Sequence, residues 1–503
     1  MPALFNVLAS GRIRPDHRPW LRAEVDAALW CALAQQLAEG RWTLLGLWGD
    51  AGAVHMALLD ATGGAVGVAS LACADGTFPS VGRLHAPAQR LERTITDLFG
   101  LTPVDAPDTR PWLDHGRWPV SRPLAARPGA PEAAPYAFLP VEGEGLHEVA
   151  VGPVHAGIIE PGHFRFTANG EAVVRLEERL GYVHRGVEGL MAGASVAQGA
   201  ALAGRVCGDS TVAYALAFAR AVEAALGVAA PERAQWLRGL MAELERLANH
   251  IGDIGAVCND AAFPRLLAPC AVLREQVLRA AEAGFGQRMM KDRIVPGGVT
   301  ADLAPAGAAR IRALVSTARA ALPELISIYD GTASLQDRTA GTGFARPDLV
   351  ARFGCGGFVG RASGRGFDAR RVLPYAPYDA LTFAVPVLDG GDVNARVWVR
   401  IKEVEQSLGL VTQMLDRMPE GPLGVDLPVP GAPCEGLALV EGFRGDVLAF
   451  VRLDAEGRIA RCHLRDPSWF QWPVLEAAIE GNIIADFPLC NKSFNCAYAG
   501  VDL

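Results

Sequence analysis

The spacing of apolar residues changes along the chain, and the change predicts two regions of different architecture. In residues 1–125, four-residue spacing of apolar side chains predicts helices over Leu21–Gly40 and Ala86–Phe99. Short apolar runs separated by glycine-rich turns predict strands at Trp42–Leu47, His55–Leu59 and Val66–Leu71. We therefore expect an α+β N-terminal domain over residues 1–125.

Residues 151–503 are dominated by long helical patterns. Helices are expected at Gly189–Ala203, Ser210–Leu226, Pro231–Val257, Pro269–Gly284, Pro305–Tyr329 and Ala395–Arg417. Short strands are expected at His155–Arg165, Val173–Leu176, Gly436–Glu441, Asp446–Leu453 and Arg458–Leu464. Proline, alanine and glycine dominate residues 126–150, which we interpret as a linker. The second region is thus predicted to be a large, mainly α-helical domain with small β elements.

Composition limits the classes of function. The 503 residues are 50% hydrophobic and carry a net charge of −8, so the chain can bury a large core but lacks the basic character of a nucleic-acid binder. The most apolar stretch, Ser210–Ala230, contains Arg220 and Glu223, and the N-terminus lacks the apolar core of a signal peptide. We expect a cytoplasmic chain. None of its ten cysteines forms a CxxC pair, so no iron–sulfur cluster is expected in this chain.

Two segments place reactive side chains just before predicted helices. His184, Arg185 and Glu188 are either a capped helix start with an ion pair or a carboxylate that handles a metal ion or a proton. Cys207 also precedes a helix, where the helix dipole and Arg205 would favour a thiolate. Three residues later comes a serine, whose hydroxyl is a poor ligand for a soft metal.

Histidines and charged residues mark three further places. His155 and His163 flank a segment broken by glycine and proline, where they are either packed side chains or ligands. Glu243, Arg246 and His250 share one face of a predicted helix, which indicates a buried polar patch between helices.

A third cluster is rich in glycine, arginine and aspartate. It contains Arg361, Asp368, Arg370, Tyr378 and Asp379. We interpret it as a buried ionic network, which serves either structure or proton relay.

Several motifs together carry a resemblance to a known family. They are GPVHAGIIEPGHFRF, GYVHRGVEGL, RVCGDS, PERAQWLRGLMAELERLANHIGDIG, GRASG, PYAPYDAL, GGDVNARVWVRIKEVEQSL and RCHLRDPSWFQWPVLEAAIEGNIIADFPL. Through them, residues 151–503 resemble the large subunit of membrane-bound nickel–iron hydrogenases and the homologous 49-kDa subunit of respiratory complex I. Through LERTITDLFGL and HGRWP, residues 1–125 resemble the 30-kDa subunit of complex I. The fusion resembles the large subunit of formate hydrogenlyase.

The resemblance also implies a metal site, which this sequence only partly preserves. The family holds nickel and iron with four cysteines in two CxxC pairs. The first pair corresponds here to Cys207 and Ser210, and the second to Ala497 and Gly500, with Cys496 one residue out of place. A normal nickel–iron centre is therefore not expected, and Cys207 is a remnant ligand.

Two other family sites are also incomplete. Glu188 stands at the position of a magnesium ligand, so the resemblance implies Mg²⁺ there, although the chain ends Val501–Asp–Leu503 without the family's histidine. The family's quinone-binding histidine corresponds to His155 or His163, but no tyrosine lies near Cys207–Gly208 where its partner would be.

The resemblance implies a subunit of a membrane-associated complex that couples electron transfer to ion translocation. Its expected partners are a small iron–sulfur subunit and antiporter-like membrane subunits, on the cytoplasmic face of the inner membrane. As an oxidoreductase of NADH/quinone or hydrogenase type, it would use Cys207, His163, Arg361 and Asp379 in catalysis, and His155 with His163 in cofactor binding. The alternatives are a non-catalytic protein that couples its partners and a hydrogenase with an altered metal site.

Overall fold

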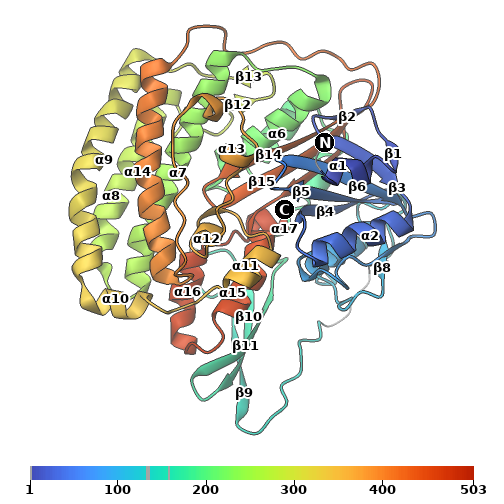
Figure 1. Cartoon of the computed structure of the whole chain (residues 1–503), viewed down its shortest axis with the longest axis horizontal. Coiled ribbons are helices and arrows are strands. Elements are labelled where there is room, and N and C mark those ends of the chain that lie inside the picture. The colour runs from blue at the N-terminus through green and yellow to red at the C-terminus, as the bar shows by residue number, and fades with distance from the viewer. Residues whose placement is uncertain (1–2, 132–135, 157–158) are drawn as a thin grey trace.

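The computed structural model describes residues 3–131, 136–156 and 159–503 and shows a mixed α/β architecture with several small sheets. Figure 1 shows long helices side by side on the left and the sheet of the first hundred residues on the right. A second sheet lies between them, and a third, formed by β9–β11, projects at the bottom.

The first hundred residues build a five-stranded sheet in the order β1-β3-β6-β5-β4. Its strands are β1 (Arg12–Ile13), β3 (Leu21–Val25), β4 (Thr43–Asp50), β5 (Ala53–Asp60) and β6 (Ala65–Ala72). Helices α1 (Ala3–Leu8), α2 (Ala27–Ala38), η1 (Ala86–Ala88) and α3 (Gln89–Phe99) accompany it, with the strand pair β7 (Thr77–Pro79) and β8 (Thr102–Val104). The strands predicted at Trp42–Leu47, His55–Leu59 and Val66–Leu71 are confirmed.

One predicted helix starts too early. Residues Leu21–Val25 form strand β3, which pairs in parallel with β6, and the helix begins only at Ala27. Asp26 accepts a hydrogen bond from the backbone N–H of Leu29 and so caps the helix at its start. The apolar spacing of Leu21–Val25 fits both periodicities, and pairing with a distant strand decides between them.

The long helices form a layer that buries most of the apolar core. They are α6 (Thr211–Leu226), α7 (Glu232–Asp260), α8 (Leu267–Phe285), α9 (Pro305–Gly331) and α14 (Val393–Arg417). Helix α7 packs against both α8 and α14, and α8 packs against α9 (Figure 1). All five predictions of a long helix in this region are confirmed to within a few residues at each end.

The sheet between the two sides contains strands from both ends of the chain. Strands β14 (Cys434–Gly442), β15 (Gly445–Leu453) and β16 (Ile459–Arg465) are antiparallel, and β2 (His17–Arg18) adds to β14 in parallel. Helix α6 packs on β14 and β15. The early residues are therefore joined to the later ones through backbone pairing as well as through side chains.

The remaining elements surround this frame. The projecting sheet consists of β9 (Leu146–Val151), β10 (His163–Asn169) and β11 (Ala172–Arg179). The strand predicted from His155 begins only at His163, and residues 157–158 lie outside the described part of the chain. The helix predicted over Gly189–Ala203 is two helices, α4 (Val187–Met191) and α5 (Val196–Ala203), because Ser195 forms a capping box with Gln198.

Short elements complete the chain. These are η2 (Pro264–Leu266), β12 (Ile294–Val295), β13 (Gly298–Val299), α10 (Ala333–Thr339), α11 (Pro347–Arg352), α12 (Gly357–Arg361), α13 (Ala369–Val372), η3 (Tyr378–Ala380), α15 (Ser468–Ala478), η4 (Ile484–Asp486), α16 (Phe487–Phe494) and α17 (Ala499–Asp502).

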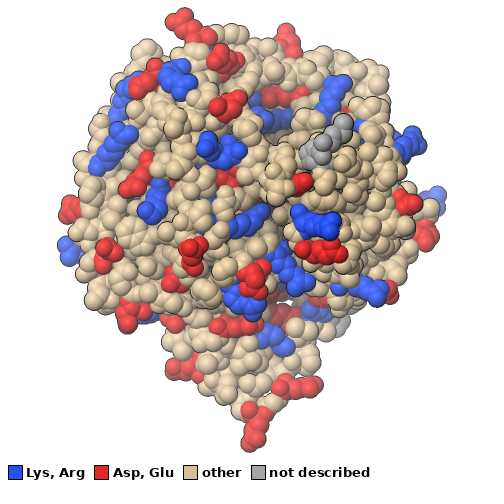
Figure 2. All heavy atoms as spheres, viewed as in Figure 1, with Lys and Arg blue, Asp and Glu red and all other residues tan. Residues whose placement is uncertain are grey.

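Among the helices that the structure describes, none combines the length and the apolar character needed to cross a membrane. Figure 2 shows Lys and Arg interspersed with Asp and Glu over one face of the molecule, without the basic stripe of a nucleic-acid binder.

Candidate functional site

A cavity of about 640 Å³ opens beside Cys207. Cys207 comes from the turn before α6, and Arg444 comes from the turn between β14 and β15. The segment after α16 contributes Cys496 and Tyr498, and His155 closes another side. Residues that are far apart in the sequence thus meet in one cavity.

Cys207 is a neutral thiol in this environment. Its sulfur donates a hydrogen bond to Oδ1 of Asp209 at 2.8 Å. Burial, together with the charge of Asp209, raises the pKa of the Cys207 thiol well above its ordinary value. Arg205, which the sequence suggested as its stabilising cation, instead forms an ion pair with Asp292 at 2.6 Å. The structure therefore contradicts the expectation of a thiolate.

Arg444 occupies the space next to the two residues at the family's first metal-ligand positions. Its guanidinium binds both carboxylate oxygens of Asp209, at 2.7 and 2.6 Å. It also donates to the hydroxyl of Ser210 at 3.2 Å and lies 3.8 Å from the sulfur of Cys207. A fixed cation at this place opposes binding of a second cation, such as a metal ion.

The second pair of ligand positions is no better suited to metal. Ala497 has no donor atom in its side chain, and there is no room for one at Gly500. A Cβ atom at Gly500 would overlap the carboxylate of Asp466 and lie 2.8 Å from the hydroxyl of Tyr214. Tyr214 donates a 2.7 Å hydrogen bond to Asp466, so this space is filled by a fixed pair. The residues present do not fit a centre held by four thiolates.

The two candidate histidines lie in different surroundings. His155 lines the cavity, with its Nε2 atom 3.4 Å from the hydroxyl of Tyr498. His163 lies outside the lining of the cavity and packs on Phe138, with ring centroids 5.0 Å apart. Burial lowers the pKa of both imidazoles. The geometry therefore favours His155 over His163 as the residue that contacts a bound molecule.

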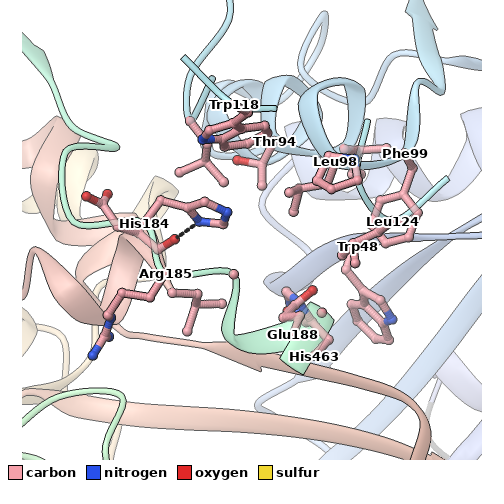
Figure 3. A pocket seen from close by; sticks show the side chains of 18 of the residues that line it. Trp48, Thr94, Leu98, Phe99, Trp118, Leu124, His184, Arg185, Glu188 and His463 are labelled. Atoms are coloured by element: carbon pink, nitrogen blue, oxygen red, sulfur yellow. Dashed lines mark hydrogen bonds and ion pairs between the residues drawn. The ribbon is translucent and has the colours of Figure 1, made fainter. Parts of the chain in front are cut away.

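Glu188 lies in a separate cavity, shown in Figure 3. Its carboxylate binds Nδ1 of His463 at 2.7 Å and the guanidinium of Arg461 at 2.8 Å. Although burial opposes ionisation, these two partners lower the pKa of Glu188 to about 2. Among the described residues, no group of three or more His, Cys, Asp or Glu side chains is arranged to hold a metal ion. The ion pair suits a structural carboxylate better than a magnesium ligand.

Arg361 is the centre of a fully buried ionic network. It binds Glu403 at 2.7 Å and Glu441 at 2.9 Å, and it lies 3.5 Å from Asp368. Arg370 links Asp368, at 2.7 Å, to Glu243 on α7, at 2.9 Å. The buried network expected from the sequence is thus present, and the polar face of α7 belongs to it.

Other members of the network come from α7 and η3. His250 contacts Glu403 at 2.7 Å, and Tyr378 donates to Glu243 at 2.7 Å. Burial and the neighbouring Asp368 raise the pKa of Glu441 to about 7. Asp379 is the exception, because its residue is exposed on η3 and takes no part in the network. Its inclusion in the buried cluster was wrong.

Two residues of the Cys207 cavity are not apparent from the sequence. Arg444 lies in a segment with the pattern of a hairpin turn, and its separation of 235 positions from Asp209 hides their contact. Tyr498 lies in the segment that corresponds to the second cysteine pair, where the missing thiols are the more obvious feature. The sequence carries one signal for Arg444: it is an arginine in the turn Phe443–Gly445, directly after a strand with an apolar, buried pattern.

Known proteins resemble this chain over most of its length. Residues 266–430 and 425–503 match the 49-kDa subunit of respiratory-chain NADH dehydrogenase, and residues 185–252 match nickel-dependent hydrogenase. Formate hydrogenlyase subunit 5 of Escherichia coli is 32% identical over 441 residues, which is 84% of this chain and 77% of that protein. The carbon monoxide-induced hydrogenase of Rhodospirillum rubrum is 33% identical over 69% of this chain and 97% of its own length.

Two further matches connect the chain to respiratory complexes. The C/D subunit of NADH-quinone oxidoreductase from Bacteroides thetaiotaomicron is 28% identical over 81% of this chain and 82% of that protein. A solved structure of the membrane-bound sulfane sulfur reductase, an archaeal respiratory membrane complex, contains a chain that is 29% identical with a TM-score of 0.68. That match covers 73% of this chain and all of the other. The chain belongs to the family that unites hydrogenase large subunits with the 49-kDa subunit of respiratory NADH dehydrogenase.

Proposed function

We propose that this chain is the peripheral, acceptor-binding subunit of a membrane-associated oxidoreductase that couples electron transfer to ion translocation. Relatives named as hydrogenase components and NADH-quinone oxidoreductase subunits support this assignment. Its partners would be a small iron–sulfur subunit and antiporter-like membrane subunits, on the cytoplasmic side of the inner membrane. In this assignment the electrons reach the chain from clusters in the partner, and the acceptor binds in this chain.

The observation that carries the proposal is the Cys207 cavity. It is large enough for a small molecule, and it joins a thiol, an imidazole, a phenol and an ion-paired guanidinium. Such a set can orient a polar acceptor and supply a proton from the thiol or the phenol. His155 accepts or donates a hydrogen bond at its Nε2 atom, depending on the partner.

The same cavity argues against hydrogen chemistry of the family's usual kind. Ser210, Ala497 and Gly500 stand at three of the four positions for thiolate ligands, and Arg444 places a cation among them. We therefore propose that no nickel–iron centre forms in this chain.

Metal analysis and one substitution test the proposal together. The complex is purified from native membranes through a tag on this chain, and nickel and iron are counted per copy. We expect no stoichiometric nickel, and iron equal to the content of the partner clusters. Stoichiometric nickel would overturn the proposal in favour of a hydrogenase with an altered site.

The substitution asks whether the cavity takes part in turnover. Cys207→Ala is expected to lower acceptor reduction by the purified complex at least tenfold, while the same partner proteins still copurify. Cys270→Ala is the matched control, because Cys270 is a buried thiol on α8 outside the cavity. Equal activity of both variants and the wild type would favour the non-catalytic coupling role.

A sulfur compound is the second candidate for the acceptor. Cys207 and Cys496 both line the cavity, where neutral thiols can donate hydrogen bonds and protons to a sulfur chain. The similar chain in the membrane-bound sulfane sulfur reductase gives this candidate its support. Polysulfide and a short-chain quinone are compared as acceptors for the same complex. The sulfur compound would be selected if the wild type reduces polysulfide faster than the quinone and Cys496→Ala loses this difference.

A further inference from the structure

A second cavity, of about 400 Å³, lies where the early sheet meets the later helices. Figure 3 shows helix α3 above it, with Leu98, Phe99 and Thr94, and Trp48 of β4 on its far side. The segment from Trp118 to Leu124 and the short helix α4 close it from two other directions. Its volume lies in the range of cavities that hold small-molecule ligands.

The lining is mostly apolar, and its charged side chains are already bound within the chain, by an ion pair or by backbone hydrogen bonds. Glu188 is neutralised by Arg461 and accepts a hydrogen bond from Nδ1 of His463. The guanidinium of Arg185 turns away from the cavity and binds the backbone carbonyl of Val206 at 2.6 Å. The carboxylate of Asp502 accepts from the backbone N–H groups of Gly181 and Val183. A charged ligand would find no partner among these groups, so the lining suits a neutral molecule.

One polar atom faces the interior with a defined role. Nδ1 of His184 lies 2.6 Å from the backbone carbonyl of Asp502, and a carbonyl can only accept, so Nδ1 carries the proton. Burial lowers the pKa of His184, which keeps the ring neutral at pH 7. Nε2 is therefore an acceptor, and Figure 3 shows this edge of the ring turned toward the cavity. The ring also packs on Trp118, with centroids 4.8 Å apart, which fixes its orientation.

The rim of the cavity is apolar as well. Leu190 is 60% exposed and Val120 is 39% exposed, and both belong to the lining. Large exposed apolar side chains around an opening mark a place where an apolar molecule enters or rests. The cavity thus has an apolar entrance, a mainly apolar interior and an inward-facing hydrogen-bond acceptor at Nε2 of His184.

We propose that this cavity is a binding site for a neutral, ring-sized apolar compound that carries a hydroxyl group. The ring lies among Leu98, Phe99 and Leu124, and the hydroxyl donates to Nε2 of His184. The ion pair of Glu188 with Arg461 leaves neither charge free for an ionic ligand. The site is separate from the Cys207 cavity, since no residue lines both.

Binding of 2-naphthol and of naphthalene to the purified full-length chain tests the proposal. Affinities are measured by fluorescence titration for the wild type and three variants. The wild type is expected to bind 2-naphthol about 2- to 12-fold more tightly than naphthalene, the contribution of one neutral hydrogen bond. His184→Phe keeps a ring against Trp118 and removes the acceptor, so it is expected to abolish this difference while naphthalene still binds.

A second variant blocks the cavity itself. Gly189 lies on α4 in the lining, and a Cβ atom there would reach within 3.4 Å of Leu124, so Gly189→Leu fills the entrance. This variant is expected to bind both probes at least tenfold more weakly than the wild type. The matched control is Gly409→Leu on α14, where an added Cβ meets nothing within 4 Å. Undiminished binding to Gly189→Leu, equal loss of both probes in His184→Phe, or no binding by the wild type would overturn the proposal.

Discussion

At the scale of single residues, Arg444 determines the electrostatic surroundings of Cys207 in its cavity. Its guanidinium is buried, and Asp209 and the nearby thiol hold its pKa above the ordinary value. A permanent cation bound to Asp209 through two hydrogen bonds keeps a fixed charge beside Cys207. A guanidinium held in this way beside the thiol suits hydrogen bonding to a polar acceptor.

The raised pKa of Cys207 predicts low reactivity. At pH 7.5 the neutral thiol is a poor nucleophile, so iodoacetamide should leave Cys207 unmodified in the folded chain. Cys31 is exposed and serves as the internal control, since it should be labelled within the same reaction. Peptide mass spectrometry measures both sites. Labelling of Cys207 at the rate of Cys31 would show that a thiolate is present after all.

The close packing at Gly500 predicts a sharp steric effect. In Gly500→Ala the new methyl group would overlap Asp466 and crowd Tyr214, so the pair must shift. Overpacking of this kind costs about 1–3 kcal/mol of unfolding free energy. Gly208→Ala is the control, because a Cβ there meets nothing within 4 Å. Urea denaturation of the full chain gives both values, and equal stability of the two variants would contradict the packing argument.

Single site residues could be predicted where the neighbouring sequence is distinctive, but the residues that they contact could not. Cys207, Glu188 and Arg361 were singled out because their sequence surroundings are distinctive. Their neighbours Arg444, Arg461 and Glu403 come from elements more than forty residues away, and one sequence contains no record of that proximity. Asp379 was wrongly included for a different reason: its residue type and neighbours fit the cluster, but the short helix η3 exposes it to solvent.

At the scale of elements, local periodicity was a good guide to the long helices. Helices α6–α9 and α14 need only their own apolar pattern to be recognised, because their buried faces repeat over many turns. Strand β3 was misassigned because five residues carry little periodicity, and its pairing partner β6 lies about forty residues further on. Strand β2 was missed because two residues paired to β14 give no pattern at all.

Helix α3 and the loop before it depend on one buried carboxylate, which predicts a pH effect. Glu92 accepts hydrogen bonds from the backbone N–H of Val81 at 2.6 Å and from the hydroxyl of Ser80 at 2.8 Å. Burial nevertheless raises the pKa of Glu92 to about 7. Between pH 4.5 and 7 the folded chain therefore binds more protons than the unfolded chain, so stability falls as pH rises through this window.

Glu92→Gln removes this titration. We expect the decline in unfolding free energy between pH 5 and 7.5 to be smaller in the variant by about 1–3 kcal/mol. Glu39→Gln, at the exposed end of α2, should keep the wild-type profile. Urea titrations at several pH values measure the slope. A steeper decline in Glu92→Gln than in the wild type would refute the assignment of a raised pKa.

At the scale of the whole molecule, the early and late parts of the chain share one interior. A single apolar cluster includes Leu33 and Leu98 from the first hundred residues together with Phe164, Trp472 and Phe494. The pairing of β2 with β14 adds a backbone connection. Association between the two parts is thus built into the core.

Arg90 makes this connection electrostatic as well. It lies on α3 and forms ion pairs with Glu178 of β11 and Glu476 of α15, the latter at 2.6 Å. Glu476 also accepts from the backbone N–H of Glu178 at 2.8 Å, which brings the two carboxylates together. Burial raises the pKa of Glu178 well above its ordinary value even with Arg90 present. The pKa of Glu476 is raised as well, so the two carboxyl groups share one cation, and the raised pKa values favour a bound proton between them.

Removal of that cation should destabilise the contact between the two parts. Arg90→Met leaves Glu178 and Glu476 without their counterion and is expected to cost about 3–5 kcal/mol of unfolding free energy. Replacing one acid in Arg90→Met/Glu178→Gln should restore part of the loss, because the site then holds one acidic group instead of two. Arg83→Met, which breaks an exposed pair with Asp105, should cause no measurable change. If Arg90→Met were as stable as Arg83→Met in urea titrations, the apolar core alone would hold the two parts together.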